Sequence, residues 1–405
     1  MIQTHPFRIG ESGIMKTLGT TFERQDFLLL LTNISRILKQ RGQQMRTIAV
    51  YEIMHKDRCV AWIDTVGRCE IKDPSFMPYS LYLESSEDIM VMVENINNFN
   101  YWCASRVLTL DRQYAKALLN SAGLMQATTD RDRAKIALTY HCLSLTDVFW
   151  VREQGNVVSF ADVNLYENHL DQTFIDIALR GKQYTVQNEY LARDLSTNGC
   201  YPKAWRRTED GFELLKDGGN EAVDRELLAS QICRCFDVNQ VLYEESVFDG
   251  ERVTVSKNFT STDYSIAAMD ALDIMLTNQE EDVRSFVLRL DPKNYYMMNI
   301  VDYLIGNTDR HWGNWGVLVD NSTNQPLRLH DLMDFNQAFN AYDTMDGSNC
   351  LTGFGVKMTQ REAALQAVEK IGLNQICAVD PSIFERLPQF EAMFRKRLEL
   401  LLQCL

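Results

Sequence analysis

The sequence predicts a mixed α+β protein in which a small β-rich unit with one helix precedes a mostly helical unit. Three observations support this prediction. Between residues 201 and 255, short alternating segments rich in β-branched and aromatic residues enclose one amphipathic stretch. From about residue 261 onward, apolar residues recur mainly at helical spacing. Residues 1–95 mix one helical stretch with a pair of strand-like segments, which indicates an additional N-terminal α/β region.

Composition and charge exclude several functional classes. Of the 405 residues, 45% are hydrophobic and 24% are charged, as in ordinary globular domains, and this length favours two or three of them. The net charge of −14 argues against a general nucleic-acid binder, which needs a basic surface. No apolar run approaches the ~18 residues of a transmembrane helix, and we expect no secretory signal. The ten cysteines form no C-x-x-C pair, so we expect reduced thiols in a cytoplasmic protein.

Two regions precede the β-rich unit. Residues 1–95 contain the predicted helix and hairpin but no motif that indicates their role. Residues 96–186 are mainly helical in pattern, with one β-like run, and join the first region to the rest. The expected elements are helices at residues 25–39, 111–122 and 130–144 and strands at residues 46–54, 58–64 and 147–151.

The β-rich unit is predicted over residues 187–260. Its first two strands meet at Glu209-Asp210-Gly211, a typical turn sequence. Asn220 is a candidate N-cap for the helix after these strands, because its side chain can accept a hydrogen bond from the first turn. The expected elements are strands at residues 201–206 and 211–216, a helix at residues 220–236, and strands at residues 241–247 and 252–255.

The helical unit is predicted over residues 261–405. Thr359 and Glu362 have the spacing of a capping box, and Gly372 follows as a helix stop. The apolar segment from about residue 388 is expected to be a terminal helix that docks on the core.

Residues 306–316 (GNTDRHWGNWG) carry the residue types that phosphoryl transfer requires. Transfer to a hydroxyl needs a carboxylate that orients and deprotonates the acceptor, and oxygen ligands that hold Mg²⁺ against the phosphates. Asp309 and Asn314 are five residues apart, the spacing of the base and the metal-binding asparagine in a protein-kinase catalytic loop. Asp334 follows a predicted strand, turn and strand and precedes a phenylalanine, so it stands where a second metal-binding carboxylate is expected.

Some roles at this segment have alternatives. Asp331 competes with Asp334 as metal ligand, but Asp334 follows two apolar residues, as at the end of a strand. His311 belongs to the candidate catalytic set, where we expect it to brace the loop backbone rather than act as a base. His311 and His330 are poor zinc candidates because no Cys or His lies at ligand spacing.

A second set of candidates lies in the β-rich unit. Lys216 ends a predicted strand and Glu226 lies about two turns into the next helix. In kinases, a strand lysine contacts the α- and β-phosphates and a helix glutamate holds it. The stretch from Gly199 to Lys203 (GCYPK) precedes these strands, where a phosphate-covering loop is expected. We therefore count Gly199 and Lys203, with Lys216, as candidate nucleotide-binding residues.

Residues 307–314 (NTDRHWGN) resemble the catalytic loop of HipA-like kinases, roughly N-x-D-x-H-x-K-N, and more closely its CtkA-type and Firmicute branches. The resemblance covers about residues 100–405 and implies a bilobal, protein-kinase-like fold with an N-lobe at 187–260 and a C-lobe at 261–405. It also implies ATP- and Mg²⁺-dependent phosphorylation of a serine or threonine in a protein substrate. Further segments that resemble this branch are residues 144–150, Lys216, 226–230, 258–261 and 334–336.

The match to this family departs at Gly313 and in the stretch from Gly199 to Lys203, which is only loosely like the family's phosphate loop. Gly313 replaces the lysine that precedes the metal-binding asparagine, and Arg310 is a candidate to compensate. Asn336 stands where the protein-kinase motif Asp-Phe-Gly has its glycine, and asparagine tolerates a left-handed backbone better than most residues.

Two other functions stay open. Phosphoinositide kinases share the D-R-H-x-x-N pattern, which allows a lipid or small-molecule kinase, and the chain could instead be a catalytically silent nucleotide-binding toxin or partner module.

Overall fold

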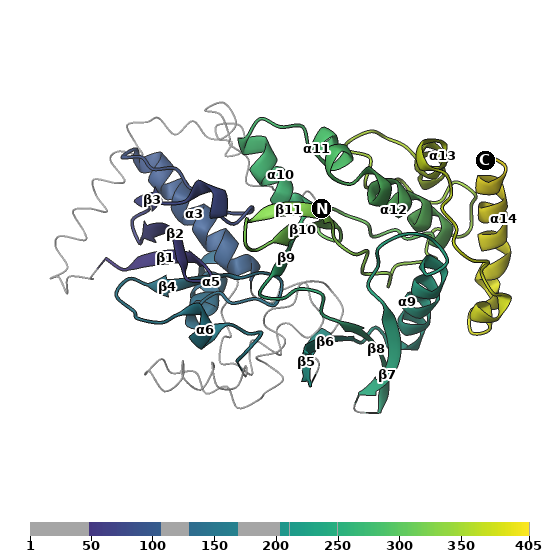
Figure 1. The fold of residues 1–405 in the computed structure, drawn as a ribbon, viewed down its shortest axis with the longest axis horizontal. Coiled ribbons are helices and arrows are strands. Elements are labelled where there is room, and N and C mark those ends of the chain that lie inside the picture. Colours follow the sequence, from purple (N-terminus) through teal and green to yellow (C-terminus); the bar gives the residue numbers. More distant parts are fainter. Residues whose placement is uncertain (1–47, 107–128, 169–202, 210, 249, 405) are drawn as a thin grey trace, which may run out of the picture.

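The computed structural model of the chain describes residues 48–106, 129–168, 203–209, 211–248 and 250–404 (Figure 1). Within these ranges the chain forms three antiparallel sheets and nine α-helices, so the predicted α+β class is confirmed. The helices expected at residues 25–39 and 111–122 lie outside the described residues. Of the helices in these ranges, none combines the length and the apolar character that crossing a bilayer requires.

The first sheet has the strand order β3-β2-β1-β4 and forms one end of the molecule (Figure 1). The predicted hairpin is confirmed as β1 and β2, and β4 confirms the predicted strand near Trp150. Helices α3 and α5 pack against each other beside this sheet, with Trp102 and Trp150 fully buried in the shared core. The elements are β1 (Val50–His55), β2 (Arg58–Asp64), β3 (Cys69–Ile71), η1 (Pro74–Phe76), α3 (Ile89–Ser105), α5 (Asp130–Thr139), β4 (Phe149–Glu153) and α6 (Phe160–Val163).

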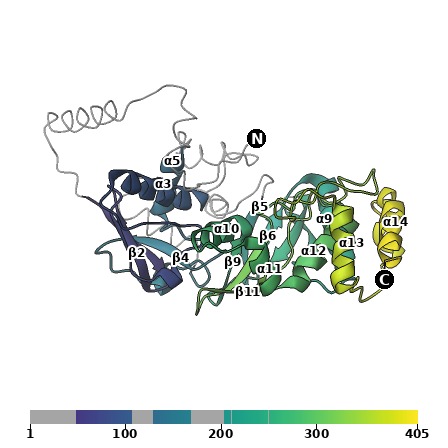
Figure 2. The ribbon, with the colours of Figure 1, turned by 90° about the horizontal axis from the view of Figure 1, so that it is seen from above.

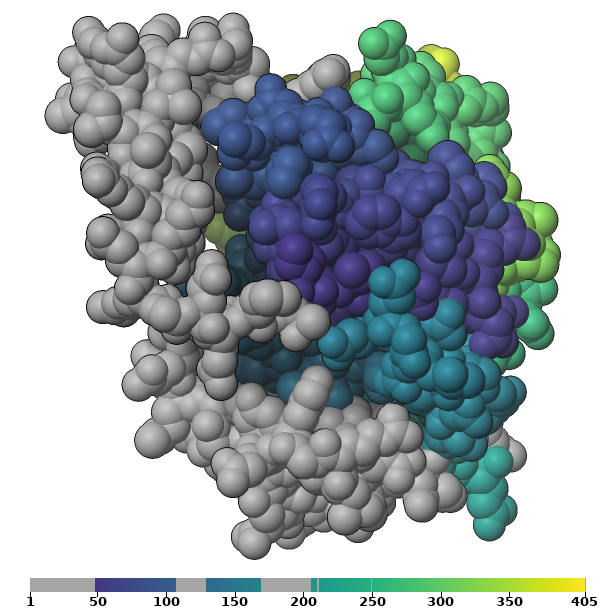
Figure 3. All heavy atoms as spheres, turned by 90° about the vertical axis from the view of Figure 1, so that its left-hand side faces the viewer, coloured from purple at the N-terminus to yellow at the C-terminus, as the bar shows by residue number. Residues whose placement is uncertain are grey.

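We call these elements the N-terminal unit, residues 48–168 as far as they are described. In Figure 3 its purple and blue atoms make up the middle of one end of the molecule, with green atoms of later elements at the margin. The proposed division of the chain at residues 95, 186 and 260 stays a prediction. Strand β4 pairs with β1, so segments on both sides of residue 95 share one sheet.

The second sheet has the order β5-β6-β8-β7 and carries helix α9 against it. All four predicted strands and the helix between them are confirmed. The helix begins slightly earlier than expected, with Gly218 rather than Asn220 as N-cap. The elements are β5 (Lys203–Thr208), β6 (Gly211–Lys216), α9 (Gly219–Cys233), β7 (Tyr243–Phe248) and β8 (Glu251–Lys257).

The third sheet, β9 (Tyr264–Ala268), β10 (Gly316–Asp320) and β11 (Gln325–Leu329), lies in the middle of the molecule (Figure 1). The sequence indicates β10 and β11, whereas β9 was not expected. Strand β9 forms by pairing with β10, and this pairing brings the two backbones very close at Gly316. A Cβ at position 316 would lie only 2.0 Å from the carbonyl oxygen of Ala267. Glycine at 316 therefore permits a strand pair that no local pattern in β9 predicts.

The helical unit packs around α12, whose residues from Met297 to Ile305 are buried. The predicted capping box is confirmed, since Thr359 and Glu362 bond each other's backbone at the start of α13, and Gly372 ends that helix. A terminal helix is also confirmed (Figure 2). The elements are α10 (Met269–Asn278), α11 (Val283–Leu290), α12 (Pro292–Ile305), α13 (Gln360–Ile371), η2 (Pro381–Phe384), η3 (Pro388–Phe390) and α14 (Glu391–Leu402).

The N-terminal unit is attached to the third sheet by hydrogen bonds whose acceptors are backbone carbonyl oxygens. The Tyr79 hydroxyl donates to the carbonyl of Asn324 at 2.8 Å, and the Asn324 amide donates back to the carbonyls of Ser75 and Met77. The Ile266 N–H donates to the Thr146 carbonyl at 2.9 Å. These contacts place the N-terminal unit along one side of a cavity between the sheets.

Candidate functional site

The cavity, of about 770 Å³, lies where the three sheets meet, and side chains from all parts of the fold line it. Lys216 comes from the second sheet. Asp309 and Asn314 come from the segment just before β10 of the third sheet, and Asp334 comes from the segment after β11. Arg106 of the N-terminal unit also lines the cavity. The fold therefore brings together candidate residues that are more than one hundred positions apart in sequence.

Lys216, the last residue of β6, binds two carboxylates. Its Nζ lies 2.9 Å from Oε1 of Glu226 and 3.1 Å from Oδ1 of Asp334. Glu226 is 2% exposed, and its second oxygen accepts a hydrogen bond from the Thr254 hydroxyl. Burial lowers the pKa of Lys216, but Asp334 and Glu226 outweigh burial and raise this pKa well above its ordinary value. The lysine therefore stays protonated, and Glu226 holds it at the cavity.

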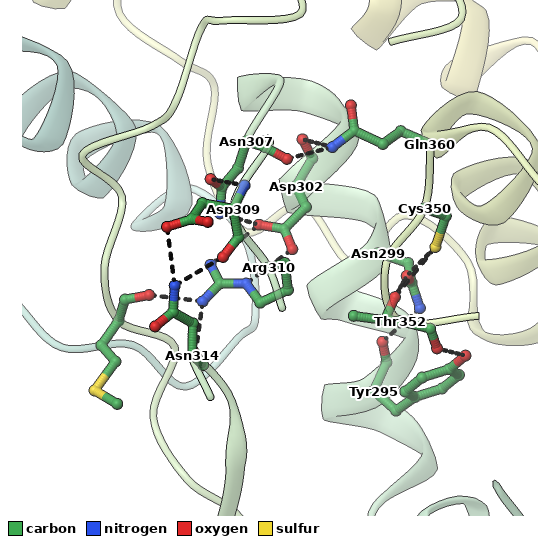
Figure 4. A network of polar contacts seen from close by, with 11 residues as sticks. Tyr295, Asn299, Asp302, Asn307, Asp309, Arg310, Asn314, Cys350, Thr352 and Gln360 are labelled. Atoms are coloured by element: carbon green, nitrogen blue, oxygen red, sulfur yellow. Dashed lines mark hydrogen bonds and ion pairs between the residues drawn. The ribbon is translucent and has the colours of Figure 1, made fainter. Parts of the chain in front are cut away.

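The loop after α12 brings Asp309 and Asn314 into contact (Figure 4). The Asn314 Nδ2 donates to the Asp309 carbonyl at 2.7 Å and to its carboxylate at 3.2 Å. With Nδ2 committed in this way, Oδ1 is the atom of the Asn314 amide that can act as an oxygen ligand. Burial raises the pKa of Asp309, and so does Asp334, while His311 and Asn314 oppose the rise.

His311 braces the backbone of this loop, as expected from the sequence. Its Nδ1 accepts a hydrogen bond from the Gly313 N–H at 3.0 Å, and its Nε2 lies 3.8 Å from Oδ1 of Asp309. A Cβ at position 313 would lie 2.9 Å from Cε1 of His311. The His311 ring therefore takes the space that a side chain at 313 would enter.

Asp334, rather than Asn336, has the left-handed backbone in its segment. Its φ is +63°, and Asn336 is not among the described residues with positive φ, so the conformational interpretation of Asn336 was wrong. Aspartate is one of the residues that tolerate this conformation best. Asp331 forms an ion pair with Arg328 at 2.7 Å and does not line the cavity, whereas Asp334 does.

Arg310 points into the core and cannot replace the family lysine at the cavity, so that suggestion was wrong. It is 2% exposed and binds both oxygens of Asp302, at 2.9 and 3.1 Å. Its Nη1 donates to the carbonyls of Asn314 and Met333, at 3.0 and 2.6 Å (Figure 4). Arg310 thus ties the loop that carries Asp309 to the segment that carries Asp334.

This buried pair should matter for stability. We expect Arg310→Met to lower the free energy of unfolding by about 3–5 kcal/mol, because it leaves the Asp302 carboxylate buried without its counter-charge. Arg361→Met is the matched control: Arg361 pairs with Asp346 at 3.0 Å on the exposed surface, and we expect a loss of at most about 1 kcal/mol. Urea unfolding of both variants measures the difference. Equal losses would contradict the structural role of Arg310.

Of the two candidate residues of the phosphate-covering stretch, Gly199 and Lys203, the structure describes only Lys203. Gly199 lies outside the described residues. Lys203 begins β5, and the strand register sets its Cα directly opposite that of Lys216. The phosphate-covering role of this stretch therefore stays a prediction.

Two residues of the site escaped sequence analysis. Tyr243 contacts both Lys216 and the Asp334 backbone, and no motif indicates it. Asp302 had a signal, because it is the one carboxylate in the apolar stretch 297–305 (MMNIVDYLI) and a buried carboxylate requires a partner.

No family model matches the chain, and no curated protein matches its sequence. Among solved structures, the chain is similar to the proinflammatory kinase CtkA of Helicobacter pylori, with 14% identity and a TM-score of 0.38 over 51% of this chain and 88% of that one. It is also similar to a chain of the HipA, HipB and operator DNA complex of a Shewanella oneidensis MR-1 toxin–antitoxin system. There the identity is 10% and the TM-score 0.49, over 88% and 91% of the two chains. Both TM-scores lie below 0.5, so a function for this chain has to be argued from the geometry of its site.

Proposed function

We propose that the chain is an ATP- and Mg²⁺-dependent phosphotransferase, and specifically a HipA/CtkA-like serine/threonine protein kinase. The observation that carries the proposal is the position of Lys216, which lies within 3.1 Å of both Glu226 and Asp334 in the cavity that Asp309 and Asn314 also line. A protonated lysine held by a buried glutamate, beside a carboxylate and an amide oxygen, matches the requirements of phosphoryl transfer.

The donor atoms at the cavity fit Mg²⁺. Asp334 offers a carboxylate and Asn314 an amide oxygen, and Mg²⁺ is usually held by one or two carboxylates together with the phosphates of a nucleotide. When bound, Mg²⁺ neutralises negative charge on those phosphates. Lys216 would then exchange its contact with Asp334 for a phosphate oxygen and keep its contact with Glu226. Asp309 would orient the acceptor hydroxyl and take its proton.

The proposal also covers the phosphoryl acceptor and the cellular compartment of the protein. We propose a hydroxyl of a protein substrate as acceptor, because the loop 307–314 resembles the HipA-like pattern. The nine cysteines among the described residues are free thiols, which supports a cytoplasmic setting. The lipid or small-molecule kinase and the silent nucleotide-binding module are the alternatives, and measurements of binding and of transfer separate them.

Nucleotide binding should depend on magnesium. We expect ATP to raise the melting temperature markedly more with Mg²⁺ than with EDTA, because a ligand at 100 times its Kd stabilises the folded state by about 2.7 kcal/mol. Differential scanning fluorimetry with ATP in both buffers, and with each buffer alone, makes the comparison. An equal shift in both buffers would contradict the metal role of Asn314 and Asp334.

Incubation with γ-labelled ATP, Mg²⁺ and a cell lysate tests the reaction itself. We expect label in protein, lost on treatment with a serine/threonine phosphatase. Label recovered in lipid or small-molecule fractions would favour the second kinase class. Mg²⁺-dependent ATP binding without transfer to any fraction would favour the silent module.

A further inference from the structure

Tyr243, the first residue of β7, contacts both Lys216 and Asp334. It is 4% exposed, and its hydroxyl oxygen accepts hydrogen bonds from the Asp334 N–H at 3.0 Å and from Lys216 Nζ at 3.4 Å. Its ring packs edge-on against Phe335, with 5.9 Å between centroids, and Lys216 Nζ lies 5.1 Å from the ring centre. One side chain therefore joins the lysine to the segment that carries the proposed metal ligand.

The backbone around Tyr243 is held by the helix that carries Glu226. Its N–H points at the hydroxyl oxygen of Ser230, 3.5 Å away, and its carbonyl accepts from Arg234 at 3.4 Å. Ser230 and Arg234 belong to the last turn and the C-cap of α9. Just before β7, the Val241 N–H donates to the Leu332 carbonyl at 2.9 Å. Tyr243 is thus fixed to α9 on one side and to the Asp334 segment on the other.

We propose that Tyr243 is a positioning residue that sets the backbone of Asp334, and so directs its carboxylate toward the metal and Lys216. This inference rests on the proposed function. Asp334 has the left-handed φ of +63°, a sparsely populated conformation that needs support from its surroundings. The hydrogen bond from the Asp334 N–H to the phenol oxygen provides such support at the residue that needs it.

The phenol is suited to this role because a tyrosine hydroxyl is ordinarily neutral at physiological pH. Its oxygen can accept from two N–H donors without adding a further negative charge beside Glu226 and Asp334. Phenylalanine would keep the ring contacts with Phe335 but remove the acceptor.

The test measures metal binding instead of turnover. ATP binding to the full-length chain is titrated at increasing Mg²⁺, and separately in EDTA, by isothermal calorimetry. We expect Tyr243→Phe to raise the Mg²⁺ concentration for half-maximal ATP binding by about tenfold, a change of about 1.4 kcal/mol. Binding of ATP in EDTA should differ from wild type by less than about twofold, because the polar contacts of Lys216 with Glu226 persist.

Tyr295→Phe is the matched control. It removes the same hydroxyl from another buried tyrosine, which donates to the Thr352 carbonyl at 3.0 Å and does not line the cavity. Its Mg²⁺ dependence should equal that of wild type. An unchanged Mg²⁺ midpoint in Tyr243→Phe would overturn the inference, as would a similar shift in Tyr295→Phe.

Two further outcomes are also decisive. If Tyr243→Phe does not fold, or melts far below Tyr295→Phe, the hydroxyl serves stability rather than the metal and the inference is overturned. If wild type binds ATP equally with Mg²⁺ and with EDTA, the proposed function fails before any variant is made. The two failures are therefore distinguishable.

Discussion

Replacing Asp309 with asparagine should reduce phosphoryl transfer by about 10²–10⁴-fold, the usual contribution of a positioned acid–base group. Asparagine keeps the size and shape of aspartate but cannot accept the proton of the hydroxyl. The affinity for ATP with Mg²⁺ should change little. The hydrogen bond that orients Asn314 goes to the backbone carbonyl of residue 309 at 2.7 Å, and the substitution leaves this carbonyl in place.

Single-turnover phosphorylation and equilibrium ATP binding, measured on the same protein, check both halves of this expectation. Asp346→Asn is the control, because Asp346 lies in the same unit, pairs with Arg361 on the surface and does not line the cavity. It should retain both activities. Near wild-type turnover in Asp309→Asn would remove Asp309 from the role of base.

The second large effect is expected for Asp334→Asn, which should lose Mg²⁺-dependent ATP binding together with turnover. The change removes the carboxylate that would hold the metal and one of the two anionic partners of Lys216, at 3.1 Å. Lys216 keeps Glu226 at 2.9 Å, so we expect the fold to survive. A drop in affinity of at least tenfold with Mg²⁺, equal to about 1.4 kcal/mol, and a smaller change in EDTA would identify the metal contribution.

Asp331→Asn is the matched control for this experiment. Asp331 lies three residues earlier, was the alternative metal ligand in the sequence, and pairs with Arg328 instead of facing the cavity. It should bind ATP and Mg²⁺ like wild type. The opposite pattern, with Asp331→Asn defective and Asp334→Asn normal, would reverse the assignment. If Asp309→Asn and Asp334→Asn lost ATP binding equally, the separation of base and metal ligand would not hold.

Much of the fold was predictable because its signals are local. The capping box of Thr359 and Glu362 starts α13 within one turn of chain, and β5 pairs with β6 up to Thr208 and Gly211, on either side of the predicted turn. The order of strands and helix from 203 to 257 was predicted from periodicity together with the turn signal between the first two strands. Strand β9 was not predicted, because its five residues become a strand only through pairing with β10, which is a distant segment of the sequence.

The spacing of residues in the sequence determined which side chains are candidates for the site. Asp309 and Asn314 are five positions apart, and a single loop can bring them into contact. Lys216 and Glu226 follow one another on a strand and the next helix, an arrangement that a short connection keeps close. In both pairs the two residues are close in the sequence, so their order and spacing were sufficient to select them as candidates.

Only the tertiary structure decided how these candidates are connected. The contact between Lys216 and Asp334 joins residues 118 positions apart, and Tyr243 lies between them without any motif. Arg310 turns inward and pairs with the buried Asp302 carboxylate at 2.9 Å, and no sequence pattern identified Arg310 as that partner. The left-handed backbone belongs to Asp334 and not to Asn336. Burial and long-range packing set these features, and both arise from segments that the chain brings together only on folding.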